Sequence, residues 1–184
     1  MSILKIAVAG LSAGTLAACA SAGAPLSAAP PAASAHAVVM SSAGERVGTA
    51  TLTQDAGGTV HVHMKVAGLP AGLHGVHIHA VGSCVAPAFT SAGGHFNPES
   101  KHHGLNNPSG PHAGDLPNMT VDASGNAEYD ARTSRVSLTP GAHSLFDADG
   151  SALVIHATAD DNMTDPAGNA GARIACGVIM SGTA

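Results

Sequence analysis

Large aromatic side chains are almost absent from this 184-residue sequence, which has no tryptophan, one tyrosine and three phenylalanines. A hydrophobic core must therefore be built from aliphatic residues, chiefly Val, Ile, Leu, Met and Ala. Charged residues make up only 10% of the chain, the formal net charge is −5, and Lys and Arg form no run. Because nucleic acids are recognised by clustered positive charge, we expect no nucleic acid among the partners.

The N-terminal segment lacks the length of a membrane-spanning helix. One cation, Lys5, precedes an apolar stretch at 6–18 that is short and interrupted by glycine. A spanning helix needs about 20 consecutive apolar residues, so we interpret residues 1–19 as a signal peptide.

The signal peptide ends in Leu16-Ala17-Ala18-Cys19, which resembles a bacterial lipobox. In a lipobox the Cys is cleaved at its amino side and carries lipid. The alternative is an ordinary secretory signal that is cut nearby, with Cys19 discarded. The first interpretation predicts an exported protein of the periplasm or cell envelope, in contact with the membrane only through the Cys19 lipid.

Residues 20–35 are rich in Ala, Pro, Ser and Gly and have no periodicity. Such a composition is typical of a flexible tether. The tether would connect the signal segment to a folded domain at 36–184.

Cysteine is scarce, and three residues leave one unpaired in an exported protein. If Cys19 carries lipid, Cys84 and Cys176 remain as a pair in an oxidising compartment. The bridge would close a loop of about 90 residues, worth on the order of 4–5 kcal/mol in the chain-entropy model.

Alternating apolar and polar residues, rather than a helical period, organise the rest of the chain. In 59–66 the apolar residues lie on one face, and His61, His63 and Lys65 lie on the other. Eight short strands separated by Gly-rich turns are predicted, at 38–40, 46–54, 59–66, 75–81, 119–121, 127–132, 152–158 and 172–180. This pattern is typical of an all-β sandwich or barrel. Two stretches without periodicity, 83–118 and 159–171, are expected to be functional loops.

Histidine is unusually abundant, with twelve residues. Six of them, together with one aspartate, are candidate metal ligands in four segments of the chain. Imidazole and carboxylate are the groups with which proteins hold zinc and copper, and seven ligands suit two ions better than one. The candidates are His77, His79, His95, His103, His112, Asp115 and His156.

Two histidines at i and i+2 of a strand point to the same face, about 7 Å apart along the chain. His77 and His79 could therefore reach one ion from opposite sides, as in a tetragonal copper site. His61 and His63 have the same spacing, but we interpret them as part of a solvated polar face.

The long loop holds four potential ligands within 21 residues, from His95 to Asp115. Three imidazoles and one carboxylate make a closed tetrahedral shell that suits structural zinc. A single loop histidine would more simply be solvated, and His156 alone, at the end of an apolar run, would be a core or edge residue.

Four motifs follow one another along the chain: Gly-Leu-His-Gly-Val-His-Ile-His at 72–79, Gly-Gly-His-Phe-Asn-Pro at 93–98, His-Ala-Gly-Asp-Leu at 112–116 and Gly-Asn-Ala-Gly-Ala-Arg-Ile-Ala-Cys-Gly-Val-Ile at 168–179. In this order they resemble the Cu,Zn superoxide dismutase family, over about residues 36–180. This resemblance implies an all-β, eight-stranded Greek-key fold, a flattened barrel or sandwich with two long functional loops. It also implies an enzyme that disproportionates superoxide to oxygen and hydrogen peroxide.

The resemblance further implies one copper and one zinc per chain. Copper would be bound by His77, His79, His95 and His156. Zinc would be bound by His95, acting as a bridging imidazolate, with His103, His112 and Asp115. His102 adjoins His103, and His103 is preferred because His103-Gly104 matches the family's His-Gly pair.

Three further roles follow from the resemblance. Asp160 would link a copper histidine to a zinc histidine, although alone it would be a solvated loop carboxylate. Arg173 would attract the anion beside copper, although alone it would be a surface arginine. Cys84 and Cys176 match the family's disulfide, and a homodimer is a candidate assembly.

Two other classes of function compete with the enzyme. One is an exported copper-buffering module on the same fold, in which the ligands bind metal without turnover. The other is an adhesion-like β-sandwich, which would leave the histidine spacing unexplained.

Overall fold

The computed structural model describes residues 1–3 and 33–182. The leader, with Cys19, and most of the predicted tether lie outside these residues. The described part contains no helix that is long and apolar enough to cross a membrane.

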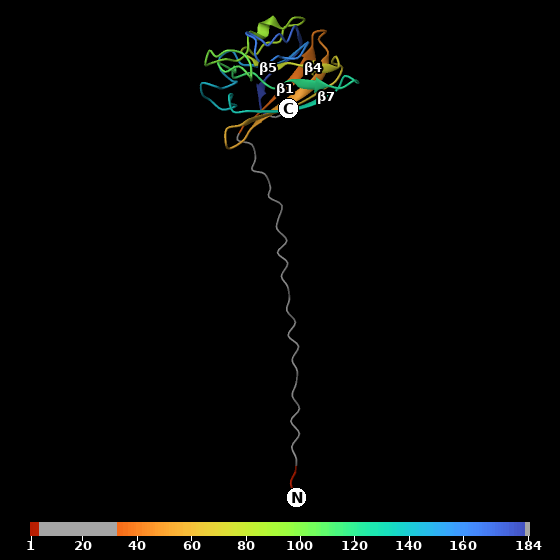
Figure 1. The fold of residues 1–184 in the computed structure, drawn as a ribbon, viewed down its shortest axis with the longest axis vertical. Helices are drawn as coiled ribbons and strands as arrows, with labels where there is room; N and C mark the ends of the chain where they lie inside the picture. The colour runs from red at the N-terminus through yellow and green to blue at the C-terminus, as the bar shows by residue number, and fades with distance from the viewer. Residues whose placement is uncertain (4–32, 183–184) are drawn as a thin grey trace.

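Regular structure in the described residues consists almost entirely of short strands (Figure 1). One 3₁₀ turn, η1 (Thr90–Ala92), interrupts the first long loop. The strands are β1 (Ala33–Ser41), β2 (Arg46–Gln54), β3 (Val60–Val66), β4 (Gly72–His74), β5 (Val76–His79), β6 (Met119–Val121), β7 (Ala127–Thr133), β8 (Ala152–His156), β9 (Arg173–Val178) and β10 (Met180–Ser181).

The main sheet has eight strands in the order β5-β8-β9-β1-β2-β3-β7, with β10 beside β1, and β4 pairs with β6 in a second sheet. The first strand lies between the ninth and the second, so connections cross the sheet as in a Greek key. The all-β prediction is confirmed. Residues 80–118 and 157–172, which join β5 to β6 and β8 to β9, are the two long loops.

The described residues form ten strands where eight were predicted, because the chain twice leaves a pairing partner within a predicted strand or beside it. At Gly75 the chain leaves β6, the partner of β4, and joins β8 as β5. At Ile179 it leaves β8, one of the two partners of β9, whereas β1 pairs with both β9 and β10. A change of partner leaves the alternation of side chains unaltered, so the sequence pattern did not mark it.

The first strand also begins earlier than the predicted domain. β1 starts at Ala33, inside the range 20–35, and Ala33 pairs with Gln54 of β2. Small side chains there carry too little hydrophobic contrast to indicate a strand.

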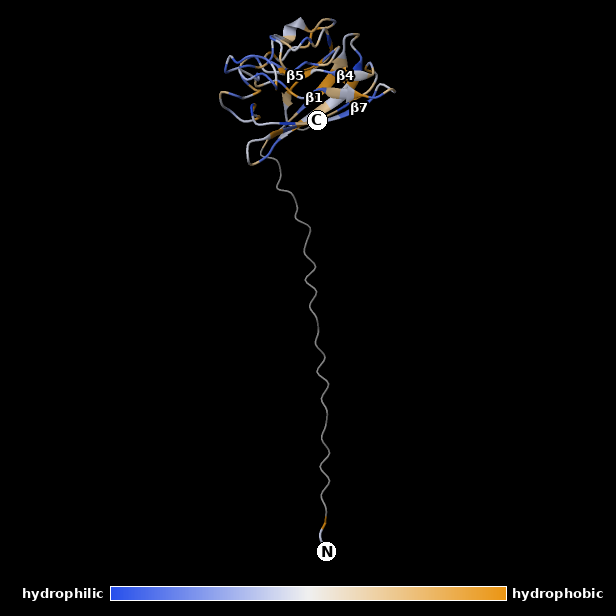
Figure 2. Ribbon diagram, viewed as in Figure 1, coloured by the Kyte–Doolittle hydropathy of each residue, from blue (hydrophilic) through white to orange (hydrophobic). Residues whose placement is uncertain are grey.

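The core is aliphatic, as the composition requires, and Figure 2 shows hydrophobic residues concentrated in the strands. In β3 the four apolar residues are buried, whereas His61 and His63 are only half-buried. His63 Nδ1 lies 2.8 Å from Asp130 Oδ1, and His61 Nε2 lies 3.3 Å from Asp55 Oδ2. The polar face predicted for this strand is therefore confirmed.

Candidate metal centre

Strand β5 is buried on both faces. Val76 and Ile78 belong to the hydrophobic core. His77 and His79 lie on the other face, under the loops 80–118 and 157–172, and are 0% and 1% exposed. The loops thus turn a strand that would otherwise have a polar outer face into the floor of an enclosed site.

Four histidines form the first cluster, and each offers a ring nitrogen within 4.8 Å of the others: His77, His79, His95 and His156. In three of them the second ring nitrogen is held by the surrounding protein. His77 Nε2 lies 2.8 Å from Asp160 Oδ2, His79 Nδ1 lies 2.9 Å from Gly93 O, and His156 Nδ1 lies 3.2 Å from Gly171 O. Such partners fix the tautomer and leave the other nitrogen free to bind a metal.

The nitrogens that face one another lack ordinary partners. Among the described residues, His77 Nδ1 and His95 Nε2 are buried with no hydrogen-bond partner. His79 Nε2 and His156 Nε2 lie 3.5 Å apart and face each other. Because unpaired buried nitrogens are costly, a cation among these four atoms fits the residues well.

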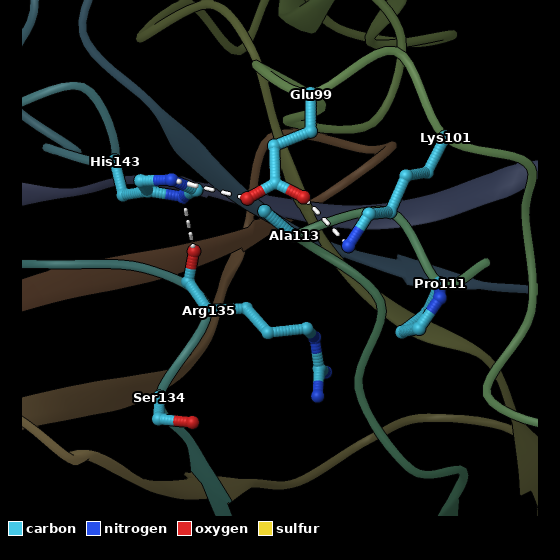
Figure 3. Close-up of a pocket in the computed structure, with 7 residues that line it drawn as sticks. All are labelled: Glu99, Lys101, Pro111, Ala113, Ser134, Arg135 and His143. Carbon is cyan, nitrogen blue, oxygen red and sulfur yellow. Dashed lines mark hydrogen bonds and ion pairs between the residues drawn. The ribbon is translucent and has the colours of Figure 1, made fainter.

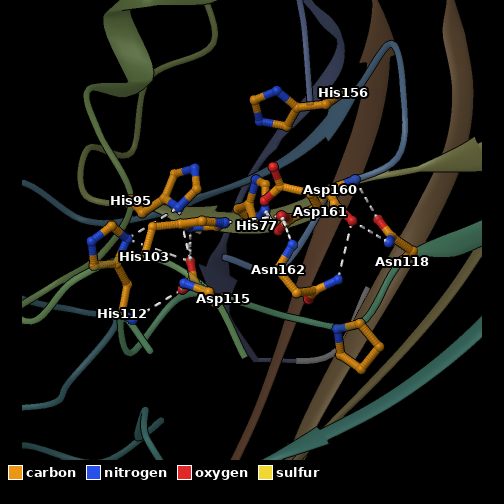
Figure 4. Close-up of polar contacts among 12 residues, drawn as sticks. His77, His95, His103, His112, Asp115, Asn118, His156, Asp160, Asp161 and Asn162 are labelled. Carbon is orange, nitrogen blue, oxygen red and sulfur yellow. Dashed lines mark hydrogen bonds and ion pairs between the residues drawn. The ribbon is translucent and has the colours of Figure 1, made fainter. Parts of the chain in front are cut away.

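A second cluster surrounds the carboxylate of Asp115 (Figure 4). Asp115 Oδ1 lies 2.8 Å from His95 Nδ1, 3.1 Å from His103 Nδ1 and 3.5 Å from His112 Nδ1. His112 Nδ1 lies 3.3 Å from His95 Nδ1. Atoms at the corners of a tetrahedron about 2.0–2.1 Å from zinc are about 3.3 Å apart, so the cluster has the spacing of a zinc shell.

Distance alone places His77, rather than His112, with His95, His103 and Asp115. His77 comes close because its ring stacks on His95, with centroids 3.9 Å apart. Its Nε2 is occupied by Asp160 and its Nδ1 faces the first cluster. His112, whose Nδ1 faces Asp115, therefore completes the second cluster better.

Backbone N–H groups of its own loop orient the carboxylate of Asp115. Its Oδ2 accepts hydrogen bonds of 2.9 Å from both Gly104 N and His112 N. These two bonds leave Oδ1 pointing toward the three imidazoles.

Asp160 joins the two clusters. Its Oδ2 lies 2.8 Å from His77 Nε2 and its Oδ1 lies 2.9 Å from His103 Nε2. The side chain of Asn118 fixes the Asp160 backbone, because it accepts from Asp160 N and donates to Asp160 O, both at 2.8 Å. Nothing in the sequence pattern marked Asn118.

The guanidinium of Arg173 is held by two carbonyl groups of loop 80–118. Nη1 donates to Phe89 O and Nη2 donates to Gly93 O, both at 2.6 Å. The same Gly93 carbonyl accepts from His79 Nδ1. A disulfide between Cys84 and Cys176, with Cα atoms 5.7 Å apart, ties this loop to β9.

Two glycines permit the close packing of the loops. A Cβ at Gly114 would lie 2.2 Å from Ile78 O of β5. A Cβ at Gly168 would lie 1.6 Å from Asp160 Oδ1 and 2.7 Å from His103 Nε2. Gly168 also has a φ of +59°, a conformation that side chains disfavour.

Burial controls the protonation of the first cluster. Desolvation, assisted by neighbouring rings, lowers the pKa of His79 to about 2, of His156 to about 3 and of His95 to about 4. These rings are therefore neutral at physiological pH, as ligation of a metal requires.

In the second cluster, interactions between the imidazoles and the carboxylates outweigh the effect of burial on protonation. Burial lowers the pKa of His103, but the carboxylates of Asp115 and Asp160 outweigh it and raise that pKa to about 9. Burial likewise opposes ionisation of Asp115, but hydrogen bonds from His103, His112 and His95 hold its pKa far below the ordinary value. The site thus keeps an anionic carboxylate ready for a cation.

The structure brings together all seven predicted ligands, with Asp160 between them and Arg173 beside the first cluster. His102 is exposed instead, and its Nδ1 contacts Asp165 Oδ2. Cys19 lies outside the described residues. The carbonyl groups of Phe89 and Gly93 were missed, because backbone acceptors leave no mark on residue type.

Comparison with known proteins gives consistent matches. A family described as copper/zinc superoxide dismutase (SODC) matches residues 46–179. Superoxide dismutase [Cu-Zn] 1 of Aquifex aeolicus is 47% identical over 146 residues, covering 78% of this chain and 86% of the relative. Superoxide dismutase-like protein YojM of Bacillus subtilis is 43% identical over 147 residues, covering 79% of this chain and 75% of the relative.

Solved structures agree in fold. A SOD-like protein from Bacillus subtilis has a TM-score of 0.74 at 43% identity, covering 77% of this chain and 95% of that one. A Cu/Zn superoxide dismutase from Brucella abortus has a TM-score of 0.64 at 27% identity, covering 79% of this chain and 98% of that one.

Proposed function

Because this chain belongs to the copper/zinc superoxide dismutase family, we propose that it converts superoxide to oxygen and hydrogen peroxide at a copper site. Copper would be held by His77, His79, His95 and His156. The observation that carries the proposal is the set of ring nitrogens facing one another, two of which are buried without a hydrogen-bond partner. Bound copper would supply one-electron chemistry by alternating between Cu(II) and Cu(I), which zinc cannot do.

The zinc site would consist of His95, His103, His112 and Asp115. We propose that His95 bridges the two sites, because its Nδ1 faces Asp115 and its Nε2 faces the first cluster. With Nδ1 held among the zinc ligands, the His95 ring would keep Nε2 facing the copper ligands. Nε2 could then hold a proton for the second superoxide, and water would supply the other proton of hydrogen peroxide.

Arg173 would bind and orient the substrate anion. Its guanidinium is always charged and presents a fork of donors that suits a diatomic anion. The Phe89 and Gly93 carbonyl groups fix the guanidinium. Burial and neighbouring imidazoles lower the pKa of His79 and His156, and the charge of Arg173 adds to this effect. Since the whole chain carries a net charge of −5, superoxide must be attracted by a local positive field.

Replacing Arg173 by glutamine tests this role. We expect superoxide turnover by the copper- and zinc-reconstituted protein to fall about tenfold or more, because a steering charge changes anion capture by 10–10³-fold. Copper content should stay unchanged, since Arg173 is not a ligand. Cyanide-sensitive turnover would be measured beside the copper signal in electron paramagnetic resonance.

The matched control is Arg132→Gln, which removes an exposed arginine from β7. Unchanged turnover in Arg173→Gln would contradict the role of Arg173. Tight copper binding without turnover in the unaltered protein would overturn the enzyme and favour copper buffering.

We also propose that the chain is exported and anchored through lipid on Cys19. The lipobox-like sequence supports this, and a disulfide suits an oxidising compartment. Mass spectrometry of the mature protein is expected to find a lipid-modified Cys19 at the N-terminus. A mature chain beginning beyond Cys19 would contradict the lipid anchor. The homodimer stays a prediction.

A further inference from the structure

A third segment contacts the metal-ligand loop although it contains none of the candidate ligands. Residues 134–146 follow β7 on the way to β8. Three of them line a hollow of about 210 Å³ together with four residues of loop 80–118 (Figure 3): Ser134, Arg135 and His143, with Glu99, Lys101, Pro111 and Ala113. This 134–146 segment reaches loop 80–118 at two points, through Arg135 and through His143.

The first contact is made to Asp115 itself. Arg135 Nη2 donates to the backbone carbonyl of Asp115 at 2.5 Å. The Asp115 carboxylate is fixed from the other side by Gly104 N and His112 N. Arg135 therefore completes a set of bonds that holds both the main chain and the side chain of one ligand.

The surroundings of the Arg135 side chain do not by themselves favour a charged group. Its side chain is partly buried, and among the described residues its buried Nε has no hydrogen-bond partner. Burial lowers the pKa of Arg135, and the nearby charge of Asp115 opposes that effect. Within the part of the chain that the structure describes, the bond from Nη2 to the Asp115 carbonyl is the one hydrogen bond that the guanidinium makes, so its position depends on Asp115.

The second contact fixes Arg135 in turn. His143 Nδ1 lies 2.9 Å from Arg135 O, and His143 Nε2 lies 3.3 Å from Glu99 Oε1. Glu99 pairs with Lys101 Nζ at 2.6 Å. His143 thus connects the main chain of Arg135 to the loop that carries His95 and His103.

We propose that Arg135, held by His143, is a positioning residue that sets how firmly the Asp115 site retains zinc. The inference rests on the proposed assignment of zinc to His95, His103, His112 and Asp115. It adds the 134–146 segment to the two long loops as a determinant of that site. Partners outside the ligand set typically change metal affinity by about 10–100-fold.

The test is zinc transfer from the holoenzyme to a chelator. For Arg135→Gln we expect zinc to transfer at a chelator concentration at least about tenfold lower than the unaltered protein requires, because Asp115 loses its backbone anchor. Arg135→Lys keeps the charge but not the planar fork, so an intermediate result is expected. Arg132→Gln, which alters an exposed arginine three residues away, should behave as the unaltered protein does.

Cobalt(II) in place of zinc gives a second readout. Its visible spectrum depends on ligand geometry, so Arg135→Gln should shift the bands, whereas a variant that is only less stable should not. His143→Gln should weaken zinc retention in the same direction by a smaller factor, and it decides the question if Arg135→Gln fails to fold.

Zinc retention and cobalt spectra unchanged in both variants would overturn this inference alone. An unaltered protein whose zinc retention did not depend on Asp115, as judged with Asp115→Asn, would overturn the zinc assignment and the inference together. Weakened retention with shifted cobalt bands would support the positioning role.

Discussion

Replacing both His77 and His79 by glutamine is expected to abolish superoxide dismutation, while the same change at His61 and His63 should leave it unaffected. Both pairs have the spacing i, i+2 on a strand. His77 and His79 are 0% and 1% exposed and face two further imidazoles, whereas the other pair is half-buried beside surface carboxylates. Loss of one outer partner costs about 10–100-fold, so loss of two direct ligands should exceed about 100-fold.

Turnover of superoxide and copper content would be measured on both double variants after reconstitution. The matched pair separates the effect of the site from the general effect of removing two histidines. Retained turnover in the His77/His79 variant would refute the copper site, and lost turnover in the His61/His63 variant would extend the site to the sheet face.

Replacing both Cys84 and Cys176 by serine is expected to lower the free energy of unfolding by about 4–5 kcal/mol. The two residues are 92 positions apart, so the bond restricts a large part of the unfolded chain. For a domain of this size the melting temperature should fall by roughly 10–15 °C. Scanning calorimetry would measure the change.

Chemical reduction of the unaltered protein is the control, and it should reproduce the shift seen in the double variant. Turnover should fall as well, because the disulfide ties down the loop whose Phe89 and Gly93 carbonyl groups hold Arg173. A melting temperature unchanged by either treatment would mean that other contacts hold this loop in place.

The strands were predictable because side-chain alternation reports burial directly, as in β3 with its buried Val60 and Met64. The candidate ligands could be named from the sequence because histidine is unusually abundant, and imidazole and carboxylate are groups with which proteins hold zinc and copper. The sequence pattern could not predict the surroundings of each histidine in the folded protein. His63 and His77 have the same local sequence form, and only the loops folding over β5 distinguish them.

The contacts that orient Asp160 and Asp115 could not be predicted from the sequence, for a different reason. Asn118 orients Asp160, and Arg135 anchors Asp115, through backbone atoms that every residue possesses. Such contacts depend on which segments cross in space, and residue type alone does not encode that. The division of strands at Gly75 and Ile179 was missed on the same ground.

The close packing at Gly114 and Gly168 has a consequence for how this protein can vary. In a library of single substitutions, these two positions should tolerate change as poorly as the histidines do. Even alanine at Gly168 would push Asp160 away from both rings that it joins, and alanine at Gly114 would drive loop 80–118 off the backbone of β5. The most restricted positions of the chain would therefore include residues that have no side chain at all.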